Sequence, residues 1–176
     1  INHQVPAAEK ETDCAKLSAQ AATMVRQDPA AELLIWQGII LSTYAGAKGG
    51  LGALDLVKQA KGSLEQAIKV DPAALDGSAY TSLGALYYQV PGWPVGFGDD
   101  EQAEVLLKKA LTVNPDGIDP NYFYGDYLAR EKRYSEAKVV LEKALAAADR
   151  PGREVADEGR RAEAKALLAK VQSELD

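Results

Sequence analysis

Residues that commonly carry catalysis or bind metals are scarce in this sequence. It contains one histidine, one cysteine and one methionine. The single cysteine, Cys14, excludes an internal disulfide bond. His3 stands alone near the N-terminus, and Cys14 has no neighbouring histidine that would activate its thiol. We therefore expect no enzymatic activity, no metal and no cofactor.

Long apolar runs and an excess of positive charge are also missing. No stretch approaches 18 consecutive apolar residues, so the sequence predicts no membrane-spanning helix, although peripheral membrane association stays open. The formal net charge is −6. Nucleic-acid binding is not expected, because affinity for phosphates depends mainly on Lys and Arg. The acidic run Asp99-Asp100-Glu101 is explained by a helix start, where the macrodipole favours negative charge, better than by a metal site.

Helix-forming composition and a regular proline spacing dominate what remains. Ala, Leu and charged side chains lose little rotamer freedom in a helix, and Val and Ile form no alternating runs typical of strands. Pro29, Pro72 and Pro115 follow one another at intervals of 43 residues. Repeats of this length are typical of stacked helical hairpins. We predict an all-α, right-handed array of antiparallel helical hairpins with about eight helices.

Proline and glycine positions divide the predicted array. Residues 1–6 are expected to be disordered, and residues 7–176 to form a single domain. This domain comprises an N-terminal helix over 7–27, hairpin units over 30–70, 76–113 and 119–148, and a C-terminal capping helix over 153–174. Two hairpins have long turns, at 46–52 and 90–98. Asp119 is expected to cap a helix that starts with Pro120.

The second and third units resemble tetratricopeptide repeats. That family pairs an aromatic-x-x-large-small-x-x-large first helix with an Ala/large/Ala second helix that ends in Pro. The matching residues are Tyr80, Leu83, Gly84 and Tyr87 with Ala103, Leu107, Ala110 and Pro115 in the second unit, and Tyr124, Gly125 and Leu128 with Ala137, Leu141 and Ala144 in the third. The first unit fits less regularly, with Ile40, Leu41 and Tyr44 in the same register. The resemblance implies a helical solenoid.

A closer resemblance is to small periplasmic tetratricopeptide proteins related to the T-component of TRAP transporters. In those proteins the array works beside a periplasmic binding protein, and relatives are implicated in handling lipids and sterols. The resemblance implies a class of role but no particular site residues. The sequence begins at Ile1 rather than Met. Together these points lead us to expect a periplasmic protein whose signal peptide has been removed, with a cytoplasmic location as the alternative.

The concave face of such an array is lined by the first helix of each hairpin. Its register gives candidate binding residues that are small or weakly polar: Ile35, Gly38 and Ser42, then Thr81, Ala85, Tyr88 and Gln89, then Tyr122, Asp126 and Arg130. These side chains leave volume for an apolar ligand or a partner helix, with Tyr88, Tyr122 and Arg130 as polar contacts. Alternatively, neighbouring helices fill that volume.

Aromatic residues in the second long turn form another candidate site. Trp93 and Phe97 lie among glycines, and Pro91 and Pro94 stiffen the segment. Large rings on a stiff turn suit recognition. The alternative is that both rings fold inward and fill the enlarged hairpin, because exposed rings without a partner favour aggregation. Trp36 is interpreted as a core residue.

These features lead to three functional hypotheses. The first is a non-enzymatic periplasmic adaptor that docks a protein partner, such as a periplasmic binding protein or a transporter component. The second is a carrier or receptor for an apolar small molecule, lipid-like or sterol-like, in the concave cavity. The third is a cytoplasmic scaffold for self-assembly. An enclosed apolar cavity with few charged lining residues would favour the second, and an exposed aromatic turn would favour the first.

Overall fold

The computed structural model describes residues 7–176, and this part of the chain is helical, without β-strands. Its eight helices are α1 (Ala7–Gln27), α2 (Ala31–Lys48), α3 (Gly52–Val70), α4 (Ala74–Gln89), α5 (Asp100–Val113), α6 (Ile118–Arg130), α7 (Tyr134–Ala146) and α8 (Glu154–Ser173). The prediction of an all-α fold is confirmed. The prediction of disorder for residues 1–6 lies outside the described residues.

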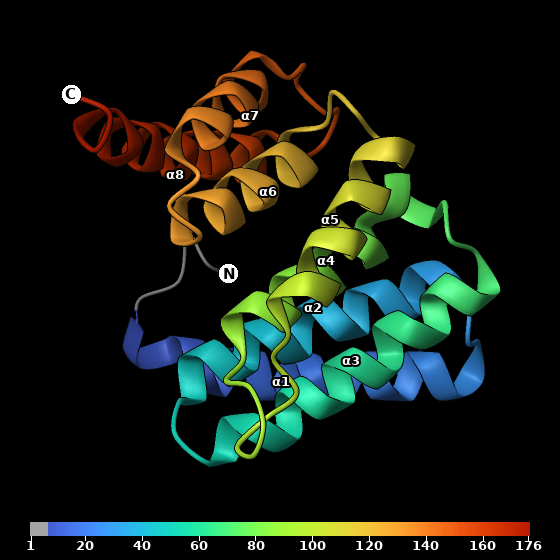
Figure 1. Cartoon of the computed structure of the whole chain (residues 1–176). Coiled ribbons are helices and arrows are strands. Elements are labelled where there is room, and N and C mark those ends of the chain that lie inside the picture. The colour runs from blue at the N-terminus through green and yellow to red at the C-terminus, as the bar shows by residue number, and fades with distance from the viewer. Residues whose placement is uncertain (1–6) are drawn as a thin grey trace.

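The helices are stacked as a series of hairpins (Figure 1). α2 packs on α3, α4 on α5, and α6 on α7, while α1 covers α2 and α8 covers α6 and α7. The first helices of the hairpins also contact one another, α2 with α4 and α4 with α6. α2, α4 and α6 therefore form one continuous wall, and the predicted hairpin array is confirmed.

The three hairpins share the same geometry where their two helices cross. A Cβ atom at Gly38, Gly84 or Gly125 would come within 2.6, 2.8 and 2.7 Å of a leucine of the second helix: Leu64, Leu107 and Leu141. These leucines and the alanines that flank them at three- and four-residue spacing are completely buried: Ala60, Ala67, Ala103, Ala110, Ala137 and Ala144. The small residue in the first helix is what lets each pair of backbones approach.

The first hairpin differs from its predicted register. The sequence pattern placed Leu41 at the helix crossing, whereas Gly38 occupies it, three residues earlier. α2 is apolar on several sides, with Leu33, Ile39 and Ile40 as well as the core residues, so its apolar pattern does not single out one face. The α2 residues that face the cavity therefore differ from those predicted.

Helix ends also differ from prediction in two places. α2 continues to Lys48 and is followed by Gly49 at φ 65, whose N–H donates to the Ala45 oxygen. A positive φ is accessible to glycine without strain, and this helix end shortens the predicted turn at 46–52 to residues 49–51. α6 begins at Ile118 after Gly117, so Asp119 lies inside its first turn and is not the cap.

Two apolar clusters make up the core. One joins α2, α3 and α4 and includes the fully buried Leu34, Ile35 and Leu64. The other joins α4 through α8 and includes Leu128 and Val171 together with several tyrosines. A cavity lies on the side where α2, α4 and α6 face the beginning of α8.

Candidate functional site

A cavity in the described part of the chain has a volume of about 850 Å³. Its walls come from α2, α4 and α6, from residues 150–153 between α7 and α8, and from the first half of α8. Lys10 of α1 adds to the lining. The cavity therefore joins segments that are far apart in the sequence.

The α2 wall presents Trp36, Ile39, Ser42 and Thr43, which share one helix face because they recur at three- and four-residue spacing. Ser42 Oγ donates to the Gly38 carbonyl oxygen at 2.7 Å, so this hydroxyl is already hydrogen-bonded. Trp36 is 39% exposed, which corrects its interpretation as a core residue. This wall is mainly apolar.

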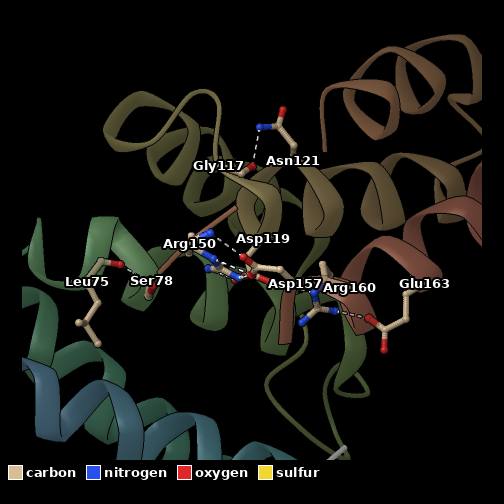
Figure 2. Close-up of polar contacts among 9 residues, drawn as sticks. All are labelled: Leu75, Ser78, Gly117, Asp119, Asn121, Arg150, Asp157, Arg160 and Glu163. Carbon is tan, nitrogen blue, oxygen red and sulfur yellow. Dashed lines mark hydrogen bonds and ion pairs between the residues drawn. The ribbon is translucent and has the colours of Figure 1, made fainter. Parts of the chain in front are cut away.

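The α4 wall starts with an unusual backbone. Leu75, Asp76 and Gly77 have φ values of 47, 55 and 72, in the left-handed region. Such a conformation costs a residue with a side chain roughly 1–2 kcal/mol. Ser78 Oγ donates to the Leu75 carbonyl oxygen at 2.5 Å and so supports this turn (Figure 2). The turn brings Leu75, which is 38% exposed, and Asp76 to the cavity lining.

The opposite wall carries an ion-pair network between α6 and α8 (Figure 2). Asp119 accepts from Arg150 Nη1 at 2.7 Å and from Arg160 Nε at 2.8 Å. Asp157, which is 1% exposed, accepts from the Arg150 backbone N–H at 2.9 Å and from Arg150 Nε at 2.8 Å. Arg160 Nη1 also donates to Glu163 at 2.5 Å. The network fastens the capping helix to the third hairpin and forms a polar side of the cavity.

Electrostatics keep these carboxylates charged. Burial raises the pKa of Asp119, but Arg160 and Arg150 outweigh that effect and hold the pKa below its ordinary value. Burial likewise raises the pKa of Asp157, and the hydrogen bonds from Arg150 reverse the direction and lower it. Asp119 is therefore explained by its distant arginine partners, which the local capping rule used on the sequence does not consider.

Aromatic rings cover the inner end of the network. The Arg160 guanidinium lies 4.5 Å from the ring centroids of both Tyr122 and Phe123. The two rings are themselves 5.2 Å apart in an edge-to-face arrangement. A cation held against two rings is fixed in position, so this part of the wall is preorganised.

The structure brings six of the ten predicted wall residues to the cavity. The lining includes Ser42, Thr81, Ala85, Gln89, Tyr122 and Asp126. Arg130 lies outside the lining, where its Nε donates to Asp126 at 3.3 Å. The described helices leave a cavity along this part of the concave face.

Three predicted wall residues are in the core and correct the prediction. Ile35 is completely buried, and Gly38 lies at the crossing with Leu64, because the register of α2 differs by three residues. Tyr88 is 9% exposed and packs on Tyr127, and its hydroxyl donates to Asp126 Oδ2 at 2.8 Å. Burial and the Asp126 charge raise the pKa of Tyr88 well above its ordinary value, so its hydroxyl stays protonated.

The second long turn separates its two rings. Trp93 is 90% exposed, whereas Phe97 packs edge-on against Tyr87 with 5.5 Å between the ring centroids. Lys61 of α3 lies 5.4 Å from the Phe97 ring centroid. The two alternatives therefore apply to different rings: Phe97 packs on α3 and α4, and Trp93 projects from the turn.

Sequence reasoning missed the lining residues outside the first helices. Arg150, Arg153 and Arg160 precede or belong to the capping helix, which was expected only to cover the array. Their interleaving with Asp and Glu is typical of a solvated helix face, so no local signal distinguishes them. Leu75 gave no signal either, because only Gly77 hints at a left-handed turn.

Searches against protein-family models and against curated proteins gave no match to this sequence. None of the described helices is long and apolar enough to cross a membrane. Within residues 7–176, no three His, Cys, Asp or Glu side chains are grouped as a metal site would require. The geometry of the cavity is therefore the main guide to function.

Proposed function

We propose that this protein is a non-enzymatic binding protein that holds a small molecule with a substantial apolar part in the cavity between α2, α4, α6 and α8. The observation that carries the proposal is the volume of about 850 Å³, which falls within the roughly 300–1,000 Å³ typical of small-molecule sites. The cavity is partly open to solvent, so a ligand of matching size can enter it.

The lining supports an apolar occupant on one side. Trp36, Ile39, Leu75, Leu86 and Phe123 contribute apolar surface, and Ala85 leaves room. Eight charged residues also line the cavity, more than the sequence hypothesis of an apolar site expected, but Asp119, Arg150, Arg160 and Glu163 are engaged with one another. The single cysteine supports binding over covalent chemistry, because burial raises the pKa of the Cys14 thiol and keeps it protonated at neutral pH.

Native mass spectrometry of the purified protein tests this proposal. We expect a co-purifying mass of lipid size, or a stoichiometric complex after addition of a single-chain amphiphile. Ser82→Phe should abolish the complex, because Ser82 lines the cavity and a ring there fills it. Ser135→Phe, at an exposed site on α7 outside the lining, is the matched control. A protein that stays free of ligand under both conditions would contradict the proposal.

A second candidate function is docking of a protein partner through the turn at 90–99. One observation favours it: Trp93 is 90% exposed on a turn that Phe97 anchors to Tyr87 of α4. Large exposed aromatic residues are common energetic centres of interfaces. The partner we propose is a periplasmic binding protein or another component of a transport system, as the tetratricopeptide resemblance implies. The two functions are compatible, because the turn and the cavity use different residues.

Site-specific photo-cross-linking tests the docking proposal. A photo-reactive residue at position 93 should capture one transport component, and the same residue at Val139, which is 56% exposed on α7, should not. The purified partner should then bind Trp93→Ala at least about tenfold more weakly than the parent chain. Equal affinity for the two proteins would exclude this role for the turn.

Membership of the tetratricopeptide family and a periplasmic location belong to the same proposal. The three glycine–leucine crossings and the buried Ala/Leu/Ala positions support the family. Fractionation of cells that express the native gene tests the location. Recovery in the cytoplasmic fraction would favour the scaffold hypothesis instead.

A further inference from the structure

The charged residues around the cavity differ in whether they already have partners. Arg150 and Arg160 are held by Asp119, and each also binds a second carboxylate, on Asp157 or Glu163 (Figure 2). Asp126 accepts from both Tyr88 and Arg130. A ligand that used any of these groups would have to break an existing ion pair or hydrogen bond.

Arg153 is the exception among the arginines of the lining. Within the described residues, no carboxylate lies within the 4.0 Å of an ion pair with its guanidinium. The guanidinium instead lies over the Trp36 ring, 5.3 Å from the ring centroid. A contact with the face of a ring leaves the N–H groups of a guanidinium available to an anion.

This contact joins two opposite sides of the cavity. Trp36 belongs to α2, and Arg153 immediately precedes α8. Among the described helices, α2 and α8 do not pack against each other, so the side chains of Trp36 and Arg153 form a direct contact between these two walls.

The lining on the α2 and α4 sides combines apolar and polar side chains. Trp36 is 39% exposed and Leu75 is 38% exposed, although both are large apolar side chains that line the cavity. Ile39 and Leu86 add apolar surface, and Ser42, Thr43, Thr81 and Ser82 add hydroxyl groups. An anionic group at Arg153 would thus lie beside the Trp36 ring, with further apolar side chains in the same lining. This arrangement complements a molecule with an apolar chain and a negatively charged head.

We propose that the cavity binds a single-chain amphiphile with an anionic head, such as a long-chain carboxylate. The head group forms an ion pair with the free N–H groups of Arg153, and the chain lies against Trp36, Ile39 and Leu86. The proposal rests on the proposed function of the cavity and adds the charge of the ligand. Since an alkyl phosphate offers the same negative charge, both head groups are part of the test.

Fluorescence of Trp36 reports on this site. The chain has only two tryptophans, so Trp93→Phe leaves Trp36 as the single reporter without touching the cavity. The probes are hexadecanoate, hexadecyl phosphate, hexadecanol and a hexadecylammonium salt, each below its aggregation concentration. We expect the carboxylate to bind roughly tenfold more tightly than the alcohol, because a hydrogen-bonded charge pair adds to the same apolar contact.

Substitution of Arg153 isolates the head-group contact. Arg153→Gln should remove most of the preference for hexadecanoate and leave hexadecanol affinity unchanged, while Arg153→Lys should retain part of the preference. Arg26→Gln, at an exposed site on α1 outside the lining, is the matched control and should retain the full preference. Thermal denaturation followed by circular dichroism confirms that each variant is folded before titration.

The outcomes distinguish the head-group proposal from the proposed function of the cavity on which it rests. Tighter binding of hexadecyl phosphate than of hexadecanoate keeps the anionic head and assigns it to phosphate. Equal binding of alcohol and carboxylate, with no effect of Arg153→Gln, would overturn the head-group proposal and leave the cavity function intact. Tighter binding of the ammonium salt would also overturn it and assign the head group to Asp76. If none of the four probes binds, the proposed function itself fails.

Discussion

The core around α2 and α3 consists of aliphatic side chains, whereas the part around α6 and α8 combines tyrosines with ion pairs. In the first region Leu34 and Leu64 are buried among alanines. In the second, Tyr124 and Tyr127 stack with 6.2 Å between ring centroids, and Asp157 is buried with Arg150 as its partner. The two regions should therefore respond to different perturbations, the first to volume and the second to charge.

This difference also explains the character of the cavity between them. The first region contributes Trp36 and Ile39, and the second contributes Asp119, Arg150 and Arg160. One wall carries more apolar side chains and the other more charged ones, and the proposed binding of an amphiphile depends on this difference. Each wall of the cavity therefore carries the same kind of side chain that stabilises its own half of the array.

The largest effect is expected from removing the buried charge in the second region. Asp157→Ala takes away the acceptor of the Arg150 backbone N–H and of its Nε, and should lower the free energy of unfolding by about 3 kcal/mol. Urea denaturation measures the change. Glu158→Ala, at the exposed neighbouring position on α8, should change stability by no more than about 0.5 kcal/mol. Similar values for the two variants would mean that the network does not stabilise the cap.

A smaller effect is expected from adding volume in the first region. Gly38→Ala places a Cβ 2.6 Å from Leu64 Cγ, so the hairpin must shift, and the free energy of unfolding should fall by about 2 kcal/mol. Gly62→Ala on α3 meets no atom within 4 Å and should raise stability by roughly 0.5–1 kcal/mol, because alanine favours the helix. Thermal and urea denaturation of the two variants would show whether close packing or helix propensity determines the change in stability at each glycine. Stabilisation by both substitutions would contradict the close crossing at Gly38.

The array was predictable because its signals are local and repeated. Ala103, Leu107 and Ala110 recur at helical spacing and precede Pro115, and the same spacing precedes Pro72. Such periodicity specifies both the helix and the face that it buries. The first hairpin escaped this reasoning because α2 is apolar on several faces, and only its contact with Leu64 identifies Gly38 as the crossing residue.

The charged side of the cavity was not predictable for the opposite reason. Asp119 looks like a local helix cap, and only the folded chain brings Arg150 and Arg160 to it. Arg153 meets Trp36 across more than a hundred intervening residues, without any motif that pairs them. Contacts between distant segments depend on the curvature of the whole array, which no short pattern encodes.

The smallest effect is expected from acid, and it should begin in the second region. Burial raises the pKa of Glu104, but Arg133, Lys108 and Tyr124 lower it from 4.5 to about 2. A carboxyl whose pKa is lower in the folded chain stabilises the fold above its unfolded pKa, and this contribution is lost as the pH falls from 4.5 towards about 2. Solvent screening limits the loss from Glu104 to about 1 kcal/mol. The lowered pKa values of Asp119 and Asp157 act in the same direction.

Amide hydrogen exchange across this pH range tests the prediction and should show α6, α7 and α8 losing protection before α2 and α3. Glu104→Gln should be less stable at neutral pH and less sensitive to acid. Equal loss of protection in both regions would mean that the ion pairs do not distinguish the two halves of the array.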